Sequence, residues 1–176
     1  MPGKIKNIFL DRDGTINEII FRDSKATSPR SVEEFRLRDD FIRFHRMATS
    51  LGRDLFIISN QPEVSRGLID RGFLEQVDLM IRSACRIKDV SYCLHDDGDG
   101  CDCRKPEPGM INRMIEKHAL QKDETIMIGD TWKDVAAGKA AGVKTVMLRR
   151  DYNRQANCQP DHQVDQLMDL WATGIF

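Results

Sequence analysis

The sequence of 176 residues contains no long hydrophobic run and no block of basic residues. No apolar stretch approaches the ~18 residues that span a bilayer, so we expect no transmembrane segment. Lys and Arg number 27 against 28 Asp and Glu, which gives a net charge of −1. The electrostatic signature of a nucleic-acid-binding protein is therefore missing. We expect that the partners of the chain include neither nucleic acid nor a membrane.

A secretion signal and a disulfide framework are also missing from the sequence. The first residues run directly into a predicted strand and lack the long apolar region of a signal peptide. The five cysteines are an odd number, and three of them lie between positions 93 and 103. Such clustering in a cytoplasmic protein indicates a metal site rather than disulfides. We therefore expect a cytoplasmic protein.

Short apolar runs alternate with helical stretches along the chain. We predict strands over residues 7–10, 54–59, 90–94, 124–130 and 143–148, and helices over residues 39–51, 69–87, 108–118 and 132–141. The nearly continuous apolar runs are typical of strands buried on both faces of a parallel sheet. No repeat or linker is visible, so we predict one α/β domain over residues 1–176 with a doubly wound, mainly parallel sheet. Residues 17–31 are either a flap or short hairpin, or a plain connection.

Two carboxylates follow the first predicted strand. Asp11 is the first polar side chain after the apolar residues 8–10, and Asp13 follows two positions later. Gly14 permits a tight turn in which both carboxylates face the same point. Such a pair suits Mg²⁺, and an Asp can also attack phosphorus as a covalent nucleophile. A surface turn is the alternative. A Ca²⁺ loop is excluded because its twelfth position holds Arg22 instead of Glu.

Polar groups also follow the other predicted strands, each at the carboxyl end of its strand. They are Ser59, Asn60, Gln61, Arg104, Lys105, Asp130 and Asp134. The carboxyl ends of parallel strands meet at one edge of a sheet, where ligands bind. A hydroxyl, a cation and two acidic clusters at that edge can together hold one phosphate and one Mg²⁺.

The order of these groups resembles the four motifs of the haloacid dehalogenase (HAD) superfamily of phosphohydrolases over roughly residues 5 to 150. Residues 11–15 match the first motif, Ser59 the second, Lys105 the third and residues 129–134 the fourth. The resemblance implies a HAD-like Rossmannoid fold. It further implies that Asp11 attacks phosphorus and becomes an aspartyl phosphate, and that Asp13 serves as general acid and then as general base.

The same resemblance implies roles for the remaining motif residues. Ser59 would donate a hydrogen bond to the phosphoryl group, and Lys105 would offset the negative charge on that group and on Asp11. Asp130, with Asp11 and the backbone carbonyl of Asp13, would hold the Mg²⁺. A further acid, Asp134, either orients the metal shell or caps the following helix.

Four potential zinc ligands lie within eleven residues. They are Cys93, His95, Cys101 and Cys103. Three thiolates and one imidazole make the closed tetrahedral set of structural zinc, with no position left open for chemistry. We expect this zinc to hold the loop that delivers Arg104 and Lys105 to the site. Reduced thiols without a metal are the alternative.

The cysteine pattern, with residues 59–61 and 66–67, resembles the small, capless branch that contains the heptose 1,7-bisphosphate phosphatases and the histidinol-phosphate phosphatase domain. The resemblance implies that Asn60, Gln61 and Arg104 contact the substrate. Residues 62–64 and Thr131 depart from the heptose pattern, which leaves the sugar open.

We therefore predict a Mg²⁺-dependent phosphomonoesterase that acts through an aspartyl phosphate on a small phosphorylated sugar. The favoured reaction is removal of the 7-phosphate from D-glycero-D-manno-heptose 1,7-bisphosphate. Histidinol phosphate or another small phosphosugar is the alternative substrate. Outside this class, a phosphotransferase or mutase and a non-catalytic zinc-stabilised module remain rivals. We expect a monomer, with an oligomer as the open alternative.

Overall fold

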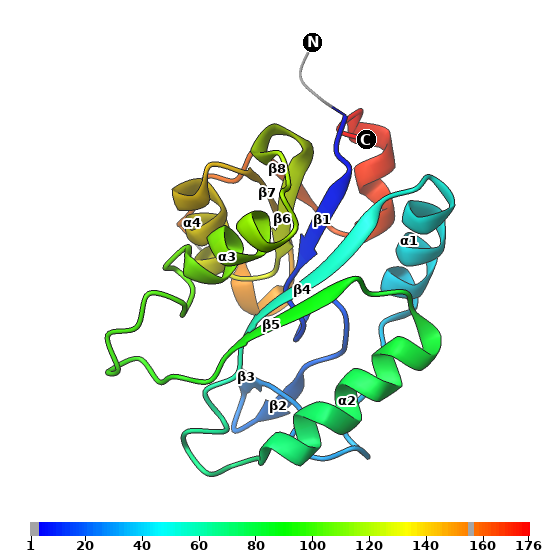
Figure 1. Cartoon of the computed structure of the whole chain (residues 1–176). Helices are drawn as coiled ribbons and strands as arrows, with labels where there is room; N and C mark the ends of the chain where they lie inside the picture. The colour runs from blue at the N-terminus through cyan, green and yellow to red at the C-terminus, as the bar shows by residue number, and fades with distance from the viewer. Residues whose placement is uncertain (1–3, 155–156) are drawn as a thin grey trace.

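A six-stranded parallel sheet runs through the centre of the protein, as the computed structural model shows (Figure 1). The structure describes residues 4–154 and 157–176. Neighbouring strands run parallel throughout, in the order β5-β4-β1-β6-β7-β8. The strands are β1 (Asn7–Leu10), β4 (Asp54–Asn60), β5 (Asp89–Cys93), β6 (Thr125–Gly129), β7 (Lys144–Leu148) and β8 (His162–Val164). The predicted α/β class is confirmed.

Helices cover both faces of the sheet (Figure 1). Helices α1 (Asp39–Ser50) and α2 (Arg71–Ala84) lie on one face, and α3 (Gly109–Lys117) and α4 (Trp132–Ala141) on the other. Successive strand side chains point to opposite faces, so Ile8 and Leu10 pack in the α1–α2 core while Phe9 packs in the α3–α4 core. This double coverage explains the continuous apolar run in each central strand.

The direction of winding reverses beside β1. The chain passes from β1 to β4 and β5 on one side, and then from β6 to β7 and β8 on the other. Because β1 and β6 are neighbours whose following segments leave in opposite directions, a crevice opens at their carboxyl ends. The doubly wound topology is thus confirmed, and it places the segments after β1 and β6 side by side.

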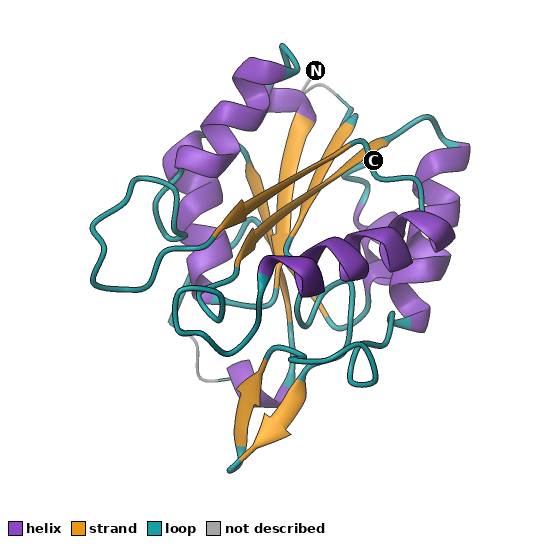
Figure 2. Ribbon diagram, turned by 60° about the horizontal axis from the view of Figure 1, so that its bottom comes forward, coloured by secondary structure: helices purple, strands orange, loops and turns teal. Residues whose placement is uncertain are grey.

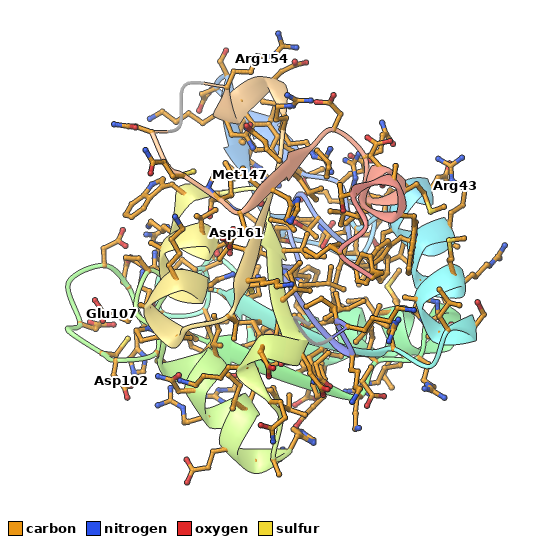
Figure 3. All side chains as sticks on the ribbon, turned by 90° about the horizontal axis from the view of Figure 1, so that it is seen from above. Arg43, Asp102, Glu107, Met147, Arg154 and Asp161 are labelled. Atoms are coloured by element: carbon orange, nitrogen blue, oxygen red, sulfur yellow. The ribbon has the colours of Figure 1, made fainter. Side chains whose placement is uncertain are left out.

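The sheet contains one strand, β8, that the sequence did not predict. Strand β8 pairs with β7 after the last predicted strand, and the 3₁₀ helix η3 (Leu167–Thr173) follows it. Asp161 starts this strand by accepting hydrogen bonds from the backbone N and the Oγ1 of Thr145, at 2.8 and 2.7 Å. Figure 3 labels Asp161 and also Met147 of β7. Only three residues long and containing one apolar residue, β8 lacks the hydrophobic pattern that reveals the other strands.

A two-stranded hairpin projects beyond the carboxyl edge of the sheet (Figure 2). Strands β2 (Ile20–Arg22) and β3 (Lys25–Thr27) pair antiparallel through Asp23 and Ser24, whose φ angles of 49° and 61° are those of a tight hairpin turn. Of the two alternatives for residues 17–31, a short hairpin and a plain connection, the structure therefore shows the hairpin. Among the described residues between β1 and α1, no larger insertion is present, so the expected capless architecture is confirmed.

None of the helices within residues 4–154 and 157–176 combines the length and the apolar character needed to cross a bilayer.

Candidate active site

A cavity of about 640 Å³ opens at the carboxyl edge of the sheet, at the point where the winding reverses. Asp11 follows β1, and Asp130 follows β6. Ser59 is the next-to-last residue of β4, and Lys105 enters from the loop after β5. All four side chains line the cavity. The structure thus brings together residues that lie more than 100 positions apart in the sequence, as their places at strand ends predicted.

Lys105 is the positive centre of the cavity. Its ammonium donates to Asp11 Oδ1 at 2.7 Å, to Asp134 Oδ1 at 2.6 Å and to the backbone carbonyl of Ile58 at 2.7 Å. Burial opposes its charge, but the two carboxylates raise the pKa of Lys105 above its usual value. The side chain therefore stays charged, with its three protons directed to fixed acceptors.

Three buried carboxylates surround this single ammonium. Asp11, Asp130 and Asp134 each offer an oxygen, and these oxygens all lie within 4.8 Å of one another. Burial raises the pKa of Asp11 to about 6, although Lys105 acts in the opposite direction. Burial and the negative charges of Asp11 and Asp134 raise the pKa of Asp130 well above its usual range. The cluster thus has more negative charge than Lys105 neutralises.

Asp130 provides the test of whether a cation fits this cluster. Its Oδ1 is buried and has no hydrogen-bond partner among the described residues. A buried carboxylate oxygen without a partner is costly, and a divalent cation removes that cost. Hard oxygen ligands of this kind suit Mg²⁺. The residues present therefore fit the expected metal.

Asp134 has a double role in the structure. Its Oδ2 accepts from the backbone N and Oγ1 of Thr131, at 3.0 and 2.7 Å, and so closes a capping box at the start of α4. Its Oδ1 accepts from Lys105. The carboxylate also lies against Gly129, where an added Cβ would approach Asp134 Cγ to 2.2 Å. Helix capping therefore also positions Lys105.

The carboxylate of Asp13 is surrounded by donors. Arg12 donates to it through Nε and Nη2, both at 3.1 Å, Gln61 through Nε2 at 2.8 Å and Asn17 through Nδ2 at 3.0 Å. Burial alone would raise the pKa of Asp13, but Arg12 and the two amides lower it below the usual value. Sequence reasoning missed Arg12, which is fully buried, because nothing in a strand-end pattern marks an arginine as internal.

The two amides expected to contact substrate have different surroundings. Gln61 is fully buried and lies behind the cavity wall, where its Oε1 accepts from Arg12 at 2.8 Å and its Nε2 also donates to Ser59 Oγ at 3.1 Å. The buried Arg12 needs an acceptor besides Asp13, and Gln61 supplies it. Asn60 lines the cavity and exchanges two hydrogen bonds with the backbone of Lys105, at 2.9 and 3.0 Å.

Cationic side chains surround the mouth of the cavity. Arg66, Arg104 and Lys133 all line it. Arg104 donates to Asp97 at 2.8 Å, and Lys133 lies 3.5 Å from the same carboxylate. Arg66 donates through Nε to Asp96 at 2.8 Å. The three cations thus face two carboxylates, and the remaining positive charge can attract a further anionic group.

Four metal-ligating side chains meet beside this mouth. The Sγ atoms of Cys93, Cys101 and Cys103 lie 3.1–3.7 Å apart, and His95 Nδ1 lies 3.3 Å from the Sγ of Cys103. Sulfur atoms on a zinc tetrahedron with bonds of about 2.3 Å are about 3.8 Å apart. The three thiols are free rather than paired in disulfides. Figure 3 labels Asp102, which separates two of them.

A segment that sequence reasoning missed completes the site. Tyr152 and Asn153, in the 3₁₀ helix η2 (Asp151–Asn153), line the cavity next to Asp130. Both side chains form hydrogen bonds to that residue. Their position after the carboxyl end of β7 is the one signal in the sequence that could have indicated them.

Replacing Gly14 by Ala is expected to lower kcat/KM by about 10²-fold, because a displacement of a catalytic group near 1 Å has that effect. Gly14 has a φ of +87°, and its added Cβ would lie 2.1 Å from Asp130 Oδ2. Gly52→Ala is the matched control, since Gly52 has a φ of +70° with nothing within 4 Å. Both variants carry the left-handed strain of about 1–2 kcal/mol, seen in thermal unfolding. Equal activities of the two variants would contradict the close contact.

The sequence is similar to those of known phosphatases, in agreement with the geometry of the site. Residues 102–170 match the sequence model of the HAD-hydrolase-like family. The chain is 31% identical over 170 residues to D-glycero-beta-D-manno-heptose-1,7-bisphosphate 7-phosphatase of Pasteurella multocida, covering 86% of this chain and 89% of that protein. It is 32% identical over 184 residues to D-glycero-D-manno-heptose-1,7-bisphosphate 7-phosphatase of Chlorobaculum tepidum, covering 92% and 90%.

Solved structures share the fold. The D,D-heptose 1,7-bisphosphate phosphatase of B. bronchiseptica, complexed with magnesium and phosphate, superposes with a TM-score of 0.84 at 24% identity, over 96% of this chain and 97% of that one. The D,D-heptose 1,7-bisphosphate phosphatase of Burkholderia thailandensis gives a TM-score of 0.69 at 20% identity, over 96% and 99%.

Proposed function

The chain belongs to the HAD-like hydrolase superfamily, in the family of the heptose-1,7-bisphosphate 7-phosphatases, and we propose that it removes the 7-phosphate of D-glycero-D-manno-heptose 1,7-bisphosphate. It is thus a phosphoric monoester hydrolase. The observation that carries the proposal is that Asp11, Lys105 and Asp130 lie together where the winding of the sheet reverses. Further cationic side chains line the mouth of the same cavity.

Asp11 is the nucleophile in this proposal. One of its oxygens attacks the phosphorus of the 7-phosphate, the bond from phosphorus to the sugar oxygen breaks, and an aspartyl phosphate forms. Lys105, already bonded to Asp11 Oδ1, holds that carboxylate in place and offsets charge on the transferring group. Ser59, whose hydroxyl lies at the cavity wall, donates to a phosphoryl oxygen. Water then attacks the phosphorus and frees Asp11.

Asp13 is the acid–base residue in this proposal. The pKa of its carboxyl is lowered in the free protein by Arg12, Gln61 and Asn17, against the effect of burial. A phosphate dianion placed beside it acts in the opposite direction and favours the protonated form. The proton passes to the leaving sugar oxygen. The resulting carboxylate, held by Arg12, then takes a proton from the attacking water.

Magnesium is the cofactor that the carboxylate cluster fits. Asp11, Asp130 and the backbone carbonyl of Asp13 would hold it, and Asp134 lies within the same group of acidic oxygens. When bound, Mg²⁺ offsets the charge that these carboxylates and the phosphoryl group bring together. The unpartnered Oδ1 of Asp130 supports this assignment.

The cations at the cavity mouth support a bisphosphate as the substrate. With one phosphate beside Asp11, a second phosphate on the same sugar meets Arg104, Arg66 or Lys133. Asn60 lines the same cavity and holds the backbone of Lys105 by two hydrogen bonds. Histidinol phosphate, the alternative, carries one phosphate and an amine, and its positive charge faces this basic mouth unfavourably.

Zinc is proposed as the structural metal of the loop after β5. Cys93, His95, Cys101 and Cys103 would bind it, and the last of these precedes Arg104 and Lys105 directly. The short distances between the three free thiols support this proposal.

We further propose that residues 1–176 act as one phosphatase domain and as a monomer. The site described above draws each of its named residues from a single chain. Free thiols suit a reducing compartment, which supports the cytoplasm as the location.

Phosphate release across a set of substrates tests the proposed function. We expect the highest kcat/KM for D-glycero-D-manno-heptose 1,7-bisphosphate, tested as both anomers, with the 7-phosphate released. The 7-monophosphate lacks the group that meets the mouth cations. Losing one or two charge-assisted hydrogen bonds should lower its kcat/KM by about 10–100-fold.

The same measurement separates the rival functions. Faster release from histidinol phosphate than from the bisphosphate would contradict the proposed substrate. A phosphotransferase would move the phosphoryl group to a second sugar instead of releasing inorganic phosphate. No turnover with any phosphosugar in the presence of Mg²⁺ would favour a non-catalytic zinc-stabilised module.

A further inference from the structure

The segment that follows β7 holds the two acidic loops of the site together. Arg150 donates through Nε and Nη2 to the carbonyl of Gly14, both at 3.2 Å. Asn153 Nδ2 donates to the carbonyls of Asp130 and Leu148, at 2.6 and 2.7 Å. Residues 150–153 therefore fix the backbone after β1 and after β6, on which the proposed magnesium site depends.

Tyr152 acts on a side chain rather than on the backbone. Its hydroxyl donates to Asp130 Oδ2. A phenol is protonated at neutral pH, so the Tyr152 hydroxyl is a hydrogen-bond donor. Asp130 Oδ2 is thereby occupied, while its Oδ1 is buried and without a hydrogen-bond partner in the described part of the chain. The phenol thus restrains the rotation of the carboxylate and leaves Oδ1 available.

The pair of Tyr152 and Asp130 is confined from another side by Gly14. A Cβ placed on Gly14 would lie 2.1 Å from Asp130 Oδ2 and 2.5 Å from the Tyr152 hydroxyl. Both groups thus pack against bare backbone. The hydrogen bond has little room to move, and its geometry depends on where the tyrosine ring lies.

The hairpin contacts this ring. The centroids of Phe21 and Tyr152 lie 6.2 Å apart with an interplanar angle of 69°, an edge-to-face contact. Phe21 lies in β2 and is 60% exposed. In Figures 2 and 3 the short helix of residues 151–153 lies beside the hairpin, and Figure 3 labels Arg154 directly after it. The hairpin that projects over the cavity therefore reaches the carboxylate cluster through Tyr152.

We propose that Tyr152 is a positioning residue for the metal site, which holds Asp130 through its hydroxyl and is itself held by Phe21 of the hairpin. The inference rests on the magnesium site of the proposed function and adds to it a residue outside the four motifs. Outer-shell partners that orient metal ligands typically change metal affinity by about 10–100-fold when they are replaced. Tyr152 should therefore affect metal binding more than the chemical step.

Tyr152→Phe is the direct test, because it removes the hydroxyl and keeps the ring against Phe21. The binding of Mn²⁺, used as a paramagnetic substitute for Mg²⁺, is measured by the EPR signal of the free ion. We expect Mn²⁺ affinity to fall by about 10-fold and the Mg²⁺ concentration for half-maximal activity to rise equally. At saturating Mg²⁺, kcat should stay within about 3-fold of the wild-type value, a split that general loss of structure would not produce.

The chain contains one other tyrosine, which provides a matched control. Tyr92 also donates its hydroxyl to a carboxylate, that of Asp78. Tyr92→Phe should leave Mn²⁺ affinity unchanged. Phe21→Ala should lower that affinity by about 3-fold and Phe21→Leu by less, because the larger side chain still supports the ring.

The outcomes separate this inference from the proposed function. Equal Mn²⁺ affinity in wild type and Tyr152→Phe, with Asp130→Asn unable to bind, would overturn the role of Tyr152 and leave the metal site intact. A wild-type protein that binds no Mn²⁺ would overturn both. An equal loss of affinity in Tyr92→Phe would show a general effect and would also refute the specific role.

Discussion

Replacing Asp11 by Asn is expected to lower kcat by at least ~10⁴-fold, because the amide oxygen cannot form the phosphoryl-enzyme bond. Asn keeps the size and shape of the side chain, and its Oδ1 can still accept from Lys105, which now lies 2.7 Å from Asp11 Oδ1. The substitution also removes one of three crowded negative charges. We therefore expect the thermal midpoint to change by only a few degrees. Loss of activity without unfolding would assign Asp11 to the chemistry.

Two further measurements make this prediction specific. Asp123→Asn, an exposed residue in the 3₁₀ helix η1 (Lys122–Glu124) before β6, is the control and should keep full activity. Acid quenching of the wild-type protein during turnover should leave a phosphoryl group on the peptide that contains Asp11. Wild-type activity in Asp11→Asn, or a phosphoryl group on a different peptide, would contradict the proposed nucleophile.

Replacing Cys103 by Ser is expected to remove the bound zinc and to affect stability and activity together. Zinc-binding energy is folding energy at such sites, so the loss of one of four ligands should destabilise the protein by several kcal/mol. For a chain of this length, that change lowers the thermal midpoint by about 10 °C. Activity should fall as well, because Cys103 directly precedes Arg104 and Lys105. Zinc content, measured by elemental analysis, is expected to fall from about one ion per chain to nearly none.

Cys158→Ser provides the control for this change. Cys158 is a half-buried free cysteine outside the cluster of four ligands. It should leave zinc content, stability and activity close to the wild-type values. A wild-type protein without zinc, or a Cys103→Ser variant with wild-type melting and activity, would refute the structural metal.

The positions of the strands were readable from the sequence because burial leaves a local pattern. Strands β1, β4 and β6 are buried along nearly their whole length, and each contains a continuous apolar run. Strand β8 was missed because an edge strand of three residues needs little apolar surface. The boundaries of the longer elements were predicted to within three residues, since amphipathic faces and glycines mark them locally.

The candidate site was readable to the extent that topology alone decides it. Carboxyl ends of parallel strands share one edge, so the polar residues that follow them had to lie near one another. The possible zinc ligands were equally accessible, because four of them lie within eleven residues and need only one loop to meet. In both cases the sequence spacing limits the geometry strongly.

The sequence by itself thus determined the class of fold, the edge at which the site lies and the types of group that meet there. Only the tertiary structure decided the partners of those groups. Arg12 finds Gln61 49 positions away, and Arg150 reaches Gly14 across 136 positions. Tyr152 bonds to Asp130 only because β7 and β6 are neighbours. Such polar contacts join residues that are far apart in the sequence and form only in the folded chain, so they leave no periodic pattern in the sequence.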